Sequence, residues 1–418
     1  MTDDTQTSGV SIDGVDAKPT DAGGHRLAYG LLISGLMAFS MGQTVLFAVL
    51  GPIAREIELR ETHVGVIVTC SALAVMVSSA LWGKLADRWG RRPVFVLGLG
   101  GYALSTFAFA GVLHAGLQDV MLPMVVLAAL IATRVAYGLI ASSVQPSAFA
   151  YVADITSEQN RSSGMAALGA AFGIGAILGP VMGAALAGFG LVVPIIAAAT
   201  LALLLALMAW FFLPEPPRGQ GDRPPALKLT DARLRPIIYL TLAIFSSFAI
   251  IQQTTAFYIQ DKFALTPQDT ATTVGLMVGG MAFSMLLAQA VIVQVFKPSP
   301  GVLVRSGLPL SVLGAIAVMW APDVPLSMAA FAIFGLGFGL LFPGVNSAAS
   351  VRVGAEEQGA ALGIVSAAMA GGFVLGPLLG TWLYEQTASW PLMLVAALCA
   401  LGWLATFTMQ LSQPRQTN

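Results

Sequence analysis

One guanidinium stands in the middle of a long apolar stretch of this 418-residue chain, and it is the side chain best suited to bind a charged partner. Arg134 is the only ionisable residue that we place so deep in such a stretch. An unpartnered charge at the centre of a lipid bilayer costs about 2.5 to 3.5 kcal/mol, so we expect Arg134 to face a cavity. Tyr137, Gly138, Ala141 and Gln145 follow at helical spacing and predict a polar track along one helix face. A structural arginine held by backbone carbonyls is the alternative.

Four side-chain amides in other apolar stretches could line the same cavity. They are Gln43, Gln252, Gln253 and Asn346. An uncharged amide tolerates burial at lipid depth only when it is hydrogen-bonded, either to a bound molecule or to a neighbouring helix. We predict that these amides contact a small-molecule substrate, with inter-helix hydrogen bonding as the equally plain alternative. Aromatic neighbours of the cavity are expected at Phe39, Phe245, Phe248 and Phe334, although simple packing would also explain them.

A third candidate is the short segment GKLADRWGRRP, which runs from Gly83 to Pro93. It holds one carboxylate, Asp87, among four cations: Lys84, Arg88, Arg91 and Arg92. The glycines would allow two helices to approach closely, and Asp87 could pair with a neighbouring arginine near a helix end. Any loop rich in lysine and arginine can also serve as a cytoplasmic anchor, which is the simpler interpretation.

The elements that carry these residues must be membrane helices. Hydrophobic residues make up 56% of the chain and charged residues 10%, with a mean hydropathy of +0.81, whereas soluble domains carry about 25% charged residues. Apolar runs long enough to cross a bilayer recur from residue 27 to residue 411, and we count twelve. They are too long and too uniformly apolar for barrel strands, so the predicted fold class is an all-α membrane protein.

The distribution of lysine and arginine predicts the orientation. With both termini in the cytoplasm, only three cations fall outside, namely Arg55, Arg60 and Lys262. Apart from Arg134, the inside segments hold the rest: Lys18, Arg26, Lys84, Arg88, Arg91, Arg92, Arg161, Arg218, Arg223, Lys228, Arg233, Arg235, Lys297, Arg305, Arg352 and Arg415. An even number of spans agrees with this arrangement. We therefore expect a multi-pass protein of the inner cell membrane.

An internal repeat divides the chain into two halves. PSAFAYVADITSEQNRSSGMAALGAAFGIGAILGPVMG in the first half parallels PGVNSAASVRVGAEEQGAALGIVSAAMAGGFVLGPLLG in the second, and Gln43 and Val64-Gly65 match Gln253 and Val274-Gly275. We predict a tail at 1–26, a six-helix bundle at 27–213, a linker at 214–235, a second bundle at 236–411 and a tail at 412–418. Two related bundles around a midline cavity are typical of transporters that alternate access by rocking one half against the other.

The repeated part includes a glycine and proline motif in each half. Its residues are Gly175, Gly179, Pro180 and Gly183 in the first half, and Gly376, Pro377 and Gly380 in the second. Glycine at every fourth position makes a smooth helix face for close packing, and proline adds a kink. Generic helix packing would give the same pattern.

The loop, the repeat and the predicted topology together resemble the major facilitator superfamily, and the resemblance spans residues 27 to 411. It implies that the loop residues Gly83, Asp87, Arg88, Arg91 and Arg92 form a conformational latch with Asp154 and Arg161. The segment from Gly175 to Gly183 is similar to the antiporter motif of drug:proton exporters in this superfamily. The pair Arg134 and Gly138 resembles a motif that is tied there to proton coupling.

The sequence departs from the pattern of these exporters in one important respect. They commonly place an acidic residue in the first span, and we find no aspartate or glutamate at mid-depth in any span. Two smaller departures are Ala184, where the family has glycine, and Tyr137, where it has glutamine. A cavity with a cation and no carboxylate should favour anionic or neutral amphipathic solutes over lipophilic cations. Proton exchange would then have to use Asp154, Asp87 or the solute itself.

The predicted function is export of a small amphipathic solute by alternating access, with protons as a possible second partner, by a protein that works as a monomer in the lipid bilayer. Export or facilitated passage of an anionic metabolite, such as a siderophore or sugar derivative, is one alternative, and a membrane receptor or scaffold without transport is another. We expect no enzyme activity, cofactor, metal or nucleic-acid partner. The three histidines have no ligand spacing, and the glycines at 335, 337 and 339 interrupt an apolar run instead of following a strand.

Overall fold

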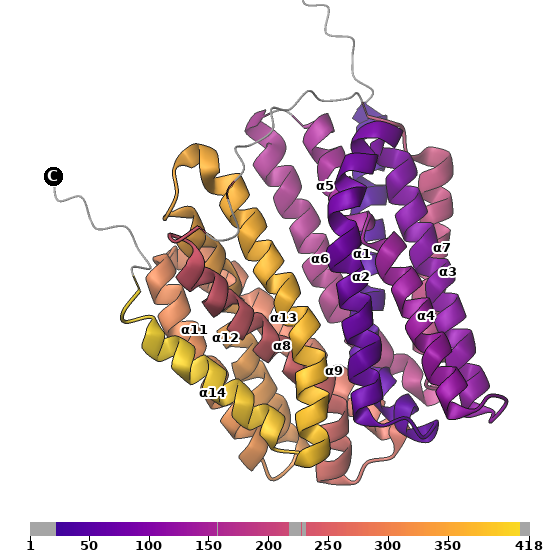
Figure 1. Cartoon of the computed structure of the whole chain (residues 1–418). Helices are drawn as coiled ribbons and strands as arrows, with labels where there is room; N and C mark the ends of the chain where they lie inside the picture. Colours follow the sequence, from indigo (N-terminus) through magenta and orange to yellow (C-terminus); the bar gives the residue numbers. More distant parts are fainter. Residues whose placement is uncertain (1–21, 157, 217–226, 228–230, 410–418) are drawn as a thin grey trace, which may run out of the picture.

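The computed structural model describes residues 22–156, 158–216, 227 and 231–409, and every long element in these ranges is a helix (Figure 1). The N-half comprises α1 (Ala22–Glu56), α2 (Glu61–Trp89), α3 (Arg91–Leu117), α4 (Pro123–Ala141), α5 (Val144–Ile155), α6 (Glu158–Leu186), η1 (Ala187–Phe189) and α7 (Val193–Phe212). The C-half comprises α8 (Arg235–Phe263), α9 (Pro267–Leu287), η2 (Ala288–Val293), α10 (Gln294–Phe296), α11 (Pro300–Trp320), α12 (Val324–Ser350), η3 (Ala355–Glu357), α13 (Gln358–Gln386) and α14 (Trp390–Ala405).

These helices make twelve membrane crossings, as the sequence predicted. In the described part of the chain, 11 segments are long and apolar enough to span a bilayer, and the shorter apolar helix α14 supplies the last crossing. Two crossings are interrupted helices, α4 with α5 and α9 with η2 and α10. Helix α1 already begins at Ala22, so the end of the predicted N-terminal tail is helical.

The break between α4 and α5 corrects the predicted polar track. Pro146 has no N–H and cannot donate to the carbonyl of Ser142, and the Ser143 hydroxyl donates back to the Ile140 carbonyl at 2.9 Å. The helix therefore turns at the two serines. Gln145 lies beyond this turn in α5, where it is exposed, and it does not continue the face of α4 that carries Arg134.

The internal repeat is also visible in how helices pair. Contacts join α1 to α6, α3 to α7 and α2 to α4 in the N-half, and the equivalent contacts join α8 to α13, α11 to α14 and α9 to α12 in the C-half. In both halves the glycine motif packs against the first helix. Cβ atoms built on Gly183 and Gly380 would lie 3.3 Å from Ala48 on α1 and 3.1 Å from Ile250 on α8. Glycine is needed because the backbones approach too closely for side chains.

The two halves contact each other through two equivalent helix crossings, α2 with α13 and α6 with α9. A Cβ built on Gly65 of α2 would lie 2.9 Å from the carbonyl oxygen of Pro377. One built on Gly275 of α9, the repeat partner of Gly65, would clash with the carbonyl oxygen of Pro180. The glycines of each motif thus pack against the first helix of their own half, and the proline of each motif contacts the other half.

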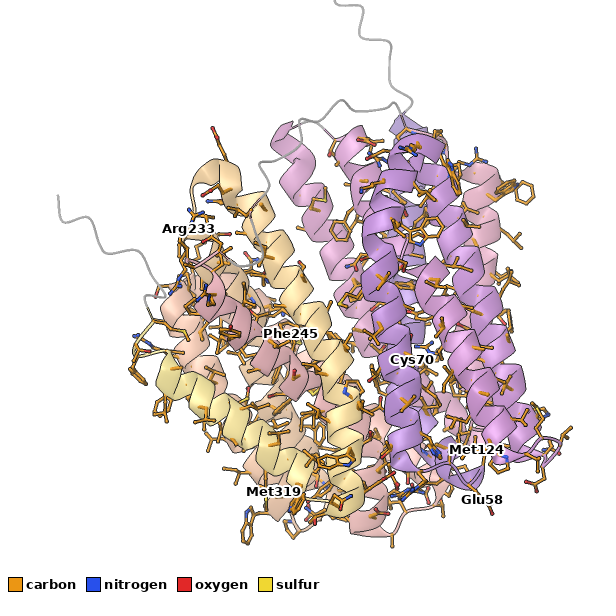
Figure 2. All side chains as sticks on the ribbon, in the orientation of Figure 1. Glu58, Cys70, Met124, Arg233, Phe245 and Met319 are labelled. Atoms are coloured by element: carbon orange, nitrogen blue, oxygen red, sulfur yellow. The ribbon has the colours of Figure 1, made fainter. Side chains whose placement is uncertain are left out.

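Both crossings lie toward one end of the molecule. We call the end at which α1 finishes the Arg55 end, and the opposite end, at which α3 begins, the Arg91 end. Glu58, which is labelled at the bottom of Figure 2, marks the Arg55 end. On α2, Gly65 and Thr69 pack against α13, and the Thr69 hydroxyl donates to the Val374 carbonyl at 3.0 Å. One and two turns further toward the Arg91 end, the same face carries Leu73 and Met76, which are 40% and 39% exposed.

The α6 and α9 crossing opens in the same direction. A Cβ on Gly279 of α9 would lie 2.8 Å from Val181, whereas Phe283, one turn further on the same face, is 57% exposed. On α6, the space beside Gly173 is open as well. The halves are therefore closed on each other at the Arg55 end and separated toward the Arg91 end.

The tight crossings give a first testable prediction. Gly65→Val and Gly275→Val should each push the halves apart at the Arg55 end, because overpacking an interface costs about 1 to 3 kcal/mol. Ala256, which is 2% exposed and packs against Gly51 of the other half, supplies the reporter position. In a background lacking Cys70 and Cys399, labelling of Ala256→Cys by a maleimide should accelerate roughly 5- to 150-fold. Gly280→Val is the matched control, because nothing lies within 4 Å of that glycine. Equal labelling in all three variants would contradict the assigned role.

Candidate functional site

Arg134 is buried on the inward face of α4, with 6% of its surface exposed. The helix residues on either side of that face pack against α2 and α3. Its guanidinium carbon lies 4.1 Å from the ring centre of Tyr137 and 5.5 Å from that of Phe109. Among the ion pairs of the described residues, none involves Arg134. The structure therefore brings Arg134 and Tyr137 together as predicted, but aromatic rings enclose the cation in this conformation.

Several polar atoms around Arg134 are buried without a hydrogen-bond partner. They include its own Nε, the hydroxyls of Tyr102 and Tyr137 and the hydroxyl of Thr106. The Tyr102 ring stacks edge-on against Tyr137, and Phe39 stacks against the other side of Tyr102. Unpaired buried donors cost free energy, so such a group is either hydrated or ready to bind a solute. The cluster can donate hydrogen bonds to an anion and has no carboxylate to hold a cation.

The predicted amide contacts are only partly available. Gln252 and Gln253 are buried in α8, and the side-chain oxygen of Gln253 has no partner. Gln43 is half-buried in α1. The amide of Asn346 already donates to the carbonyl of Phe342 in its own helix at 2.9 Å. No hydrogen bond among the described residues joins Gln43 to either glutamine of α8, so these amides remain predicted substrate contacts.

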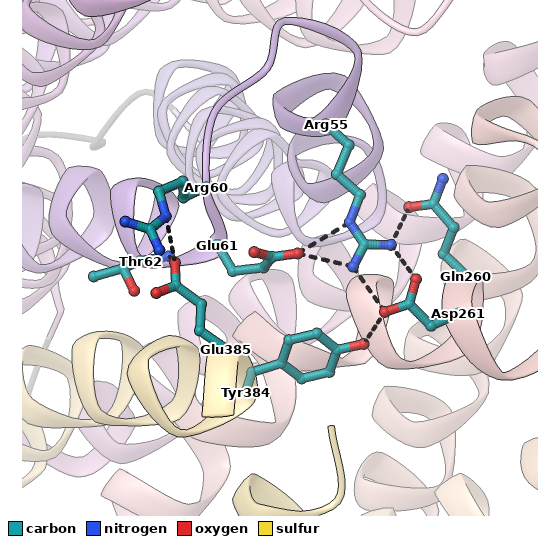
Figure 3. A network of polar contacts seen from close by, with 8 residues as sticks. All are labelled: Arg55, Arg60, Glu61, Thr62, Gln260, Asp261, Tyr384 and Glu385. Carbon is teal, nitrogen blue, oxygen red and sulfur yellow. Dashed lines mark hydrogen bonds and ion pairs between the residues drawn. The ribbon is translucent and has the colours of Figure 1, made fainter. Parts of the chain in front are cut away.

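Sequence reasoning missed a charge network that joins the two halves at the Arg55 end (Figure 3). Arg55 donates to both carboxylate oxygens of Asp261, at 2.5 and 2.8 Å, and to Glu61 at 2.8 Å. It also donates to the side chain of Gln260 at 3.1 Å, and the hydroxyl of Tyr384 donates to Asp261 at 2.5 Å. Arg55 and Glu61 belong to the N-half, whereas the other three residues belong to the C-half.

A second pair of contacts lies beside this network. The backbone N–H of Thr62 donates to Glu385 at 2.9 Å, and Arg60 lies 3.9 Å from the same carboxylate. A polar pocket of about 320 Å³ is lined by Arg55, Arg60, Glu61, Asp261, Tyr384 and Glu385. The signal was present in the sequence, because Arg55 and Arg60 are two of only three cations on the side predicted to be outside. Arg55 lies in the last turn of α1 and Asp261 in the last turn of α8, so the ends of two helices bring them together.

Arg91, at the start of α3, forms one ion pair that the composition of the loop suggested and one that the resemblance to the superfamily implied. Arg91 donates to Asp154 at 2.9 Å and to Asp87 at 2.7 Å, so the loop is tied to α5. Arg92 donates to the carbonyl of Trp210, and Arg88 is an exposed residue near the end of α2. The side chain of Arg161 lies outside the described residues. The described partners of Arg91 are all in the N-half, so in this conformation its contacts brace one half and do not bridge two.

Close approach at this loop occurs at Gly90 and not at Gly83. Nothing lies within 4 Å of a Cβ built on Gly83, whereas Gly90 has a φ of 106°, which L side chains rarely adopt. Gly90 lets the chain turn directly from α2 into α3. The carboxylate of Glu215 then accepts hydrogen bonds from the first backbone N–H groups of α3, at Arg91 and Arg92, where a negative charge is favourable.

The C-half has its own charge cluster at the Arg91 end. Arg233 lies 2.8 Å from Asp231 and 2.9 Å from Glu357, and its guanidinium lowers the pKa of both carboxyl groups below their ordinary values. Both acids come from the C-half. The described clusters at the Arg91 end are thus internal to each half, while the Arg55 network crosses between halves, as expected for a molecule closed at only one end.

The contacts of Arg91 lead to a second prediction. Asp154→Asn should destabilise the protein by about 1.5 to 3 kcal/mol, because it removes the better buried of two carboxylates that bond to Arg91. Asp87→Asn removes the exposed carboxylate from the same guanidinium and should cost less than about 1 kcal/mol. Thermal unfolding of the purified variants in detergent measures both. A larger loss in the Asp87 variant would overturn this ranking.

Comparisons with known proteins agree with the fold. The sequence model of the Major Facilitator Superfamily matches residues 32–361 and 258–418. The chain is 28% identical over 382 residues to Multidrug resistance protein 1 of Bacillus subtilis (strain 168), covering 89% of this chain and 93% of that protein. It is 27% identical over 343 residues to the class C Tetracycline resistance protein of Escherichia coli, covering 78% of this chain and 81% of that protein.

Solved structures show the same architecture at low sequence identity. A bacterial homologue of the human lysosomal transporter Spinster, in an inward-facing and occupied conformation, superposes with a TM-score of 0.73 at 14% identity, over 92% of this chain and 96% of that one. The human organic anion transporter MFSD10 gives a TM-score of 0.64 at 21% identity, over 91% and 99%. With the family model matched along nearly the whole length and the two-bundle fold in place, the chain belongs to the major facilitator superfamily.

Proposed function

We propose that this protein exports small amphipathic molecules, anionic or neutral, across the inner cell membrane by alternating access. The observation that carries the proposal is the closure of the two halves at one end only, together with a buried, donor-rich cluster at Arg134 with which no described carboxylate pairs. Helix faces that pack tightly at the Arg55 end are exposed toward the Arg91 end. An interface that is closed at one end and open at the other is what transport by rocking halves requires.

The orientation and direction complete the proposal. The excess of lysine and arginine favours a cytoplasmic Arg91 end, with both termini inside, so this conformation would be open to the cytoplasm. The glycine and proline motif of α6 and the names of the similar proteins, which are resistance proteins for several drugs, tetracyclines and quinolones, favour export. We propose that a monomer carries out the cycle and that protons drive it.

The absence of a carboxylate near Arg134 favours a second candidate within the same superfamily. An anionic metabolite, such as a siderophore or sugar derivative, would pair with the guanidinium, and its passage could be uncoupled from protons. A receptor or scaffold without transport is less well supported, because a scaffold needs no interface that separates at one end.

Flux measurements distinguish these functions. The purified protein should be reconstituted in proteoliposomes with an imposed pH gradient and tested with cations, anions and neutral amphipaths. We expect uptake of anionic or neutral compounds that collapses when the gradient is dissipated. Uptake that survives without a gradient would support the uncoupled alternative. Strong transport of ethidium would contradict the charge argument, and no flux of any compound would contradict transport.

A further inference from the structure

Six phenylalanines from three helices of the C-half form a continuous series of ring contacts. Along the series the ring centres of Phe334 and Phe338 are 4.7 Å apart, Phe338 and Phe248 4.9 Å, Phe248 and Phe373 6.1 Å, Phe373 and Phe245 6.0 Å, and Phe245 and Phe342 5.4 Å. We call this series the phenylalanine ladder. The series passes from α12 to α8 and α13, and then returns through α8 to α12. Phe245, which is labelled in Figure 2, lies at mid-height of the C-half.

The ladder faces the space between the halves. On α13, Leu375, Leu379 and Trp382 are exposed on the outer surface of the bundle, and Phe373 lies on the opposite face, between the residues that pack on α8 and those that pack on α2. On α12, Gly335 packs against α9 and Gly337 against α11. The faces that carry the ladder are therefore directed inward, away from lipid.

The ladder is also open at one end. Phe334, Phe338 and Phe245 are buried, Phe248 and Phe373 are half-buried, and Phe342 at the end of the series is 37% exposed. An ordinary core cluster would be covered on all sides. Phe342 lies nearest the C-terminal end of α12, so a planar molecule entering from the Arg91 end meets this ring first.

Polar groups beside the ladder set its chemistry. Gln252 lies one helical turn beyond Phe248 on α8, and the neighbouring Gln253 has a buried oxygen without a partner. In the N-half, Arg134 lies beside Tyr137, which contacts Tyr102, and all three side chains are buried. One half thus offers stacking surfaces and amides, and the other offers a cation and hydroxyl donors.

We infer that the phenylalanine ladder binds the ring system of the substrate, and that the transported class is planar aromatic compounds with an anionic or neutral polar group directed toward the N-half. This inference rests on the proposed function and narrows it. Offset and edge-on ring contacts are worth about 0.5 to 1.5 kcal/mol each beyond the area that they bury. Each ring removed should therefore weaken the preference for an aromatic over a saturated compound by roughly 2- to 12-fold.

The test uses six probes in matched pairs. Naphthalene carrying a carboxylate, a carboxamide or an aminomethyl group is compared with the fully saturated decalin carrying the same group, by titration calorimetry on the purified protein and by flux in proteoliposomes. The ring comparison tests the ladder, and the charge comparison tests the proposed function separately. The variants are Phe248→Leu and Phe373→Leu, which keep apolar volume but lose the ring. Phe296→Leu, at an exposed site outside the ladder, is the control.

We expect wild type and the Phe296 variant to prefer the aromatic member of each pair, and the two ladder variants to lose most of that preference while still binding the saturated compounds. Unchanged saturated binding also shows that the variants are folded. An equal affinity of wild type for both members, or a preference that survives in both ladder variants, would overturn the ladder assignment. A preference for the ammonium probes would overturn the charge argument alone, and no binding or flux of any probe would overturn both.

Discussion

Asp261→Asn and Glu61→Gln should shift the protein in opposite directions, although each removes a carboxylate from the same guanidinium. Arg55 bonds to Asp261 across the interface and to Glu61 within its own half. Asp261→Asn weakens only the closed state, because Arg55 keeps Glu61 when the halves separate. Glu61→Gln removes the partner that Arg55 would keep after opening, so separation would leave a half-buried cation unpaired. The closed state should then become more persistent.

The measurement is maleimide labelling of Ala256→Cys in the background without native cysteines. We expect about tenfold faster labelling in Asp261→Asn and about tenfold slower labelling in Glu61→Gln, a change of about 1.4 kcal/mol in each direction. High salt should reduce both differences, since these side chains are partly exposed. Glu385→Gln is the control, because a glutamine can still accept the N–H of Thr62. If the labelling rate changed in the same direction in both variants, Arg55 would not keep Glu61 as its partner when the halves separate.

Arg134→Ala should abolish transport while the protein still inserts in the membrane. The guanidinium has two aromatic neighbours and no carboxylate partner among the described residues. In our proposal, its charge therefore binds the solute. Arg134→Met, which replaces the charge with an apolar chain of similar length, should lower flux at least 100-fold without lowering the midpoint of thermal unfolding. A buried cation without an ion-pair partner does not stabilise a fold, and its removal leaves no opposite charge exposed.

The same variants separate a binding role from a structural one. With a structural arginine, Arg134→Met would unfold at lower temperature, and the ranking of anionic and neutral probes would stay the same. With a binding arginine, the preference for the carboxylate over the carboxamide probe disappears while stability holds. Arg134→Lys should retain part of the charge preference but transport slowly, because an ammonium lacks the planar surface that stacks on Tyr137. Wild-type flux in Arg134→Met would refute the assignment.

The broad architecture was predictable because lipid leaves few choices. Twelve crossings, two related halves and the contact between Arg91 and Asp87 follow from apolar runs, an internal repeat and the spacing of charges along one loop. The contact between Arg91 and Asp154 was implied only by the resemblance to the superfamily. Local errors occurred where a side chain competes with the backbone. The serines before Pro146 end α4, and Gln145 therefore left the predicted track. Likewise, the close approach predicted for the glycines of the loop occurs at Gly90 and not at Gly83, because Gly90 has a backbone conformation that cannot be read from composition.

The sequence by itself determined that this is a helical membrane protein of two homologous bundles with one cation at mid-depth and no acid beside it in the chain. Hydropathy, charge asymmetry and repetition are properties of the order of residues, so they needed no coordinates. Only the tertiary structure decided which end is closed, that Arg55 meets Asp261 across more than 200 intervening residues, and that six phenylalanines join into one ladder. The closed end and the contact of Arg55 with Asp261 depend on how the two bundles lean against each other, and the same sequence permits more than one such arrangement. The phenylalanine contacts depend on how α8, α12 and α13 pack within one bundle.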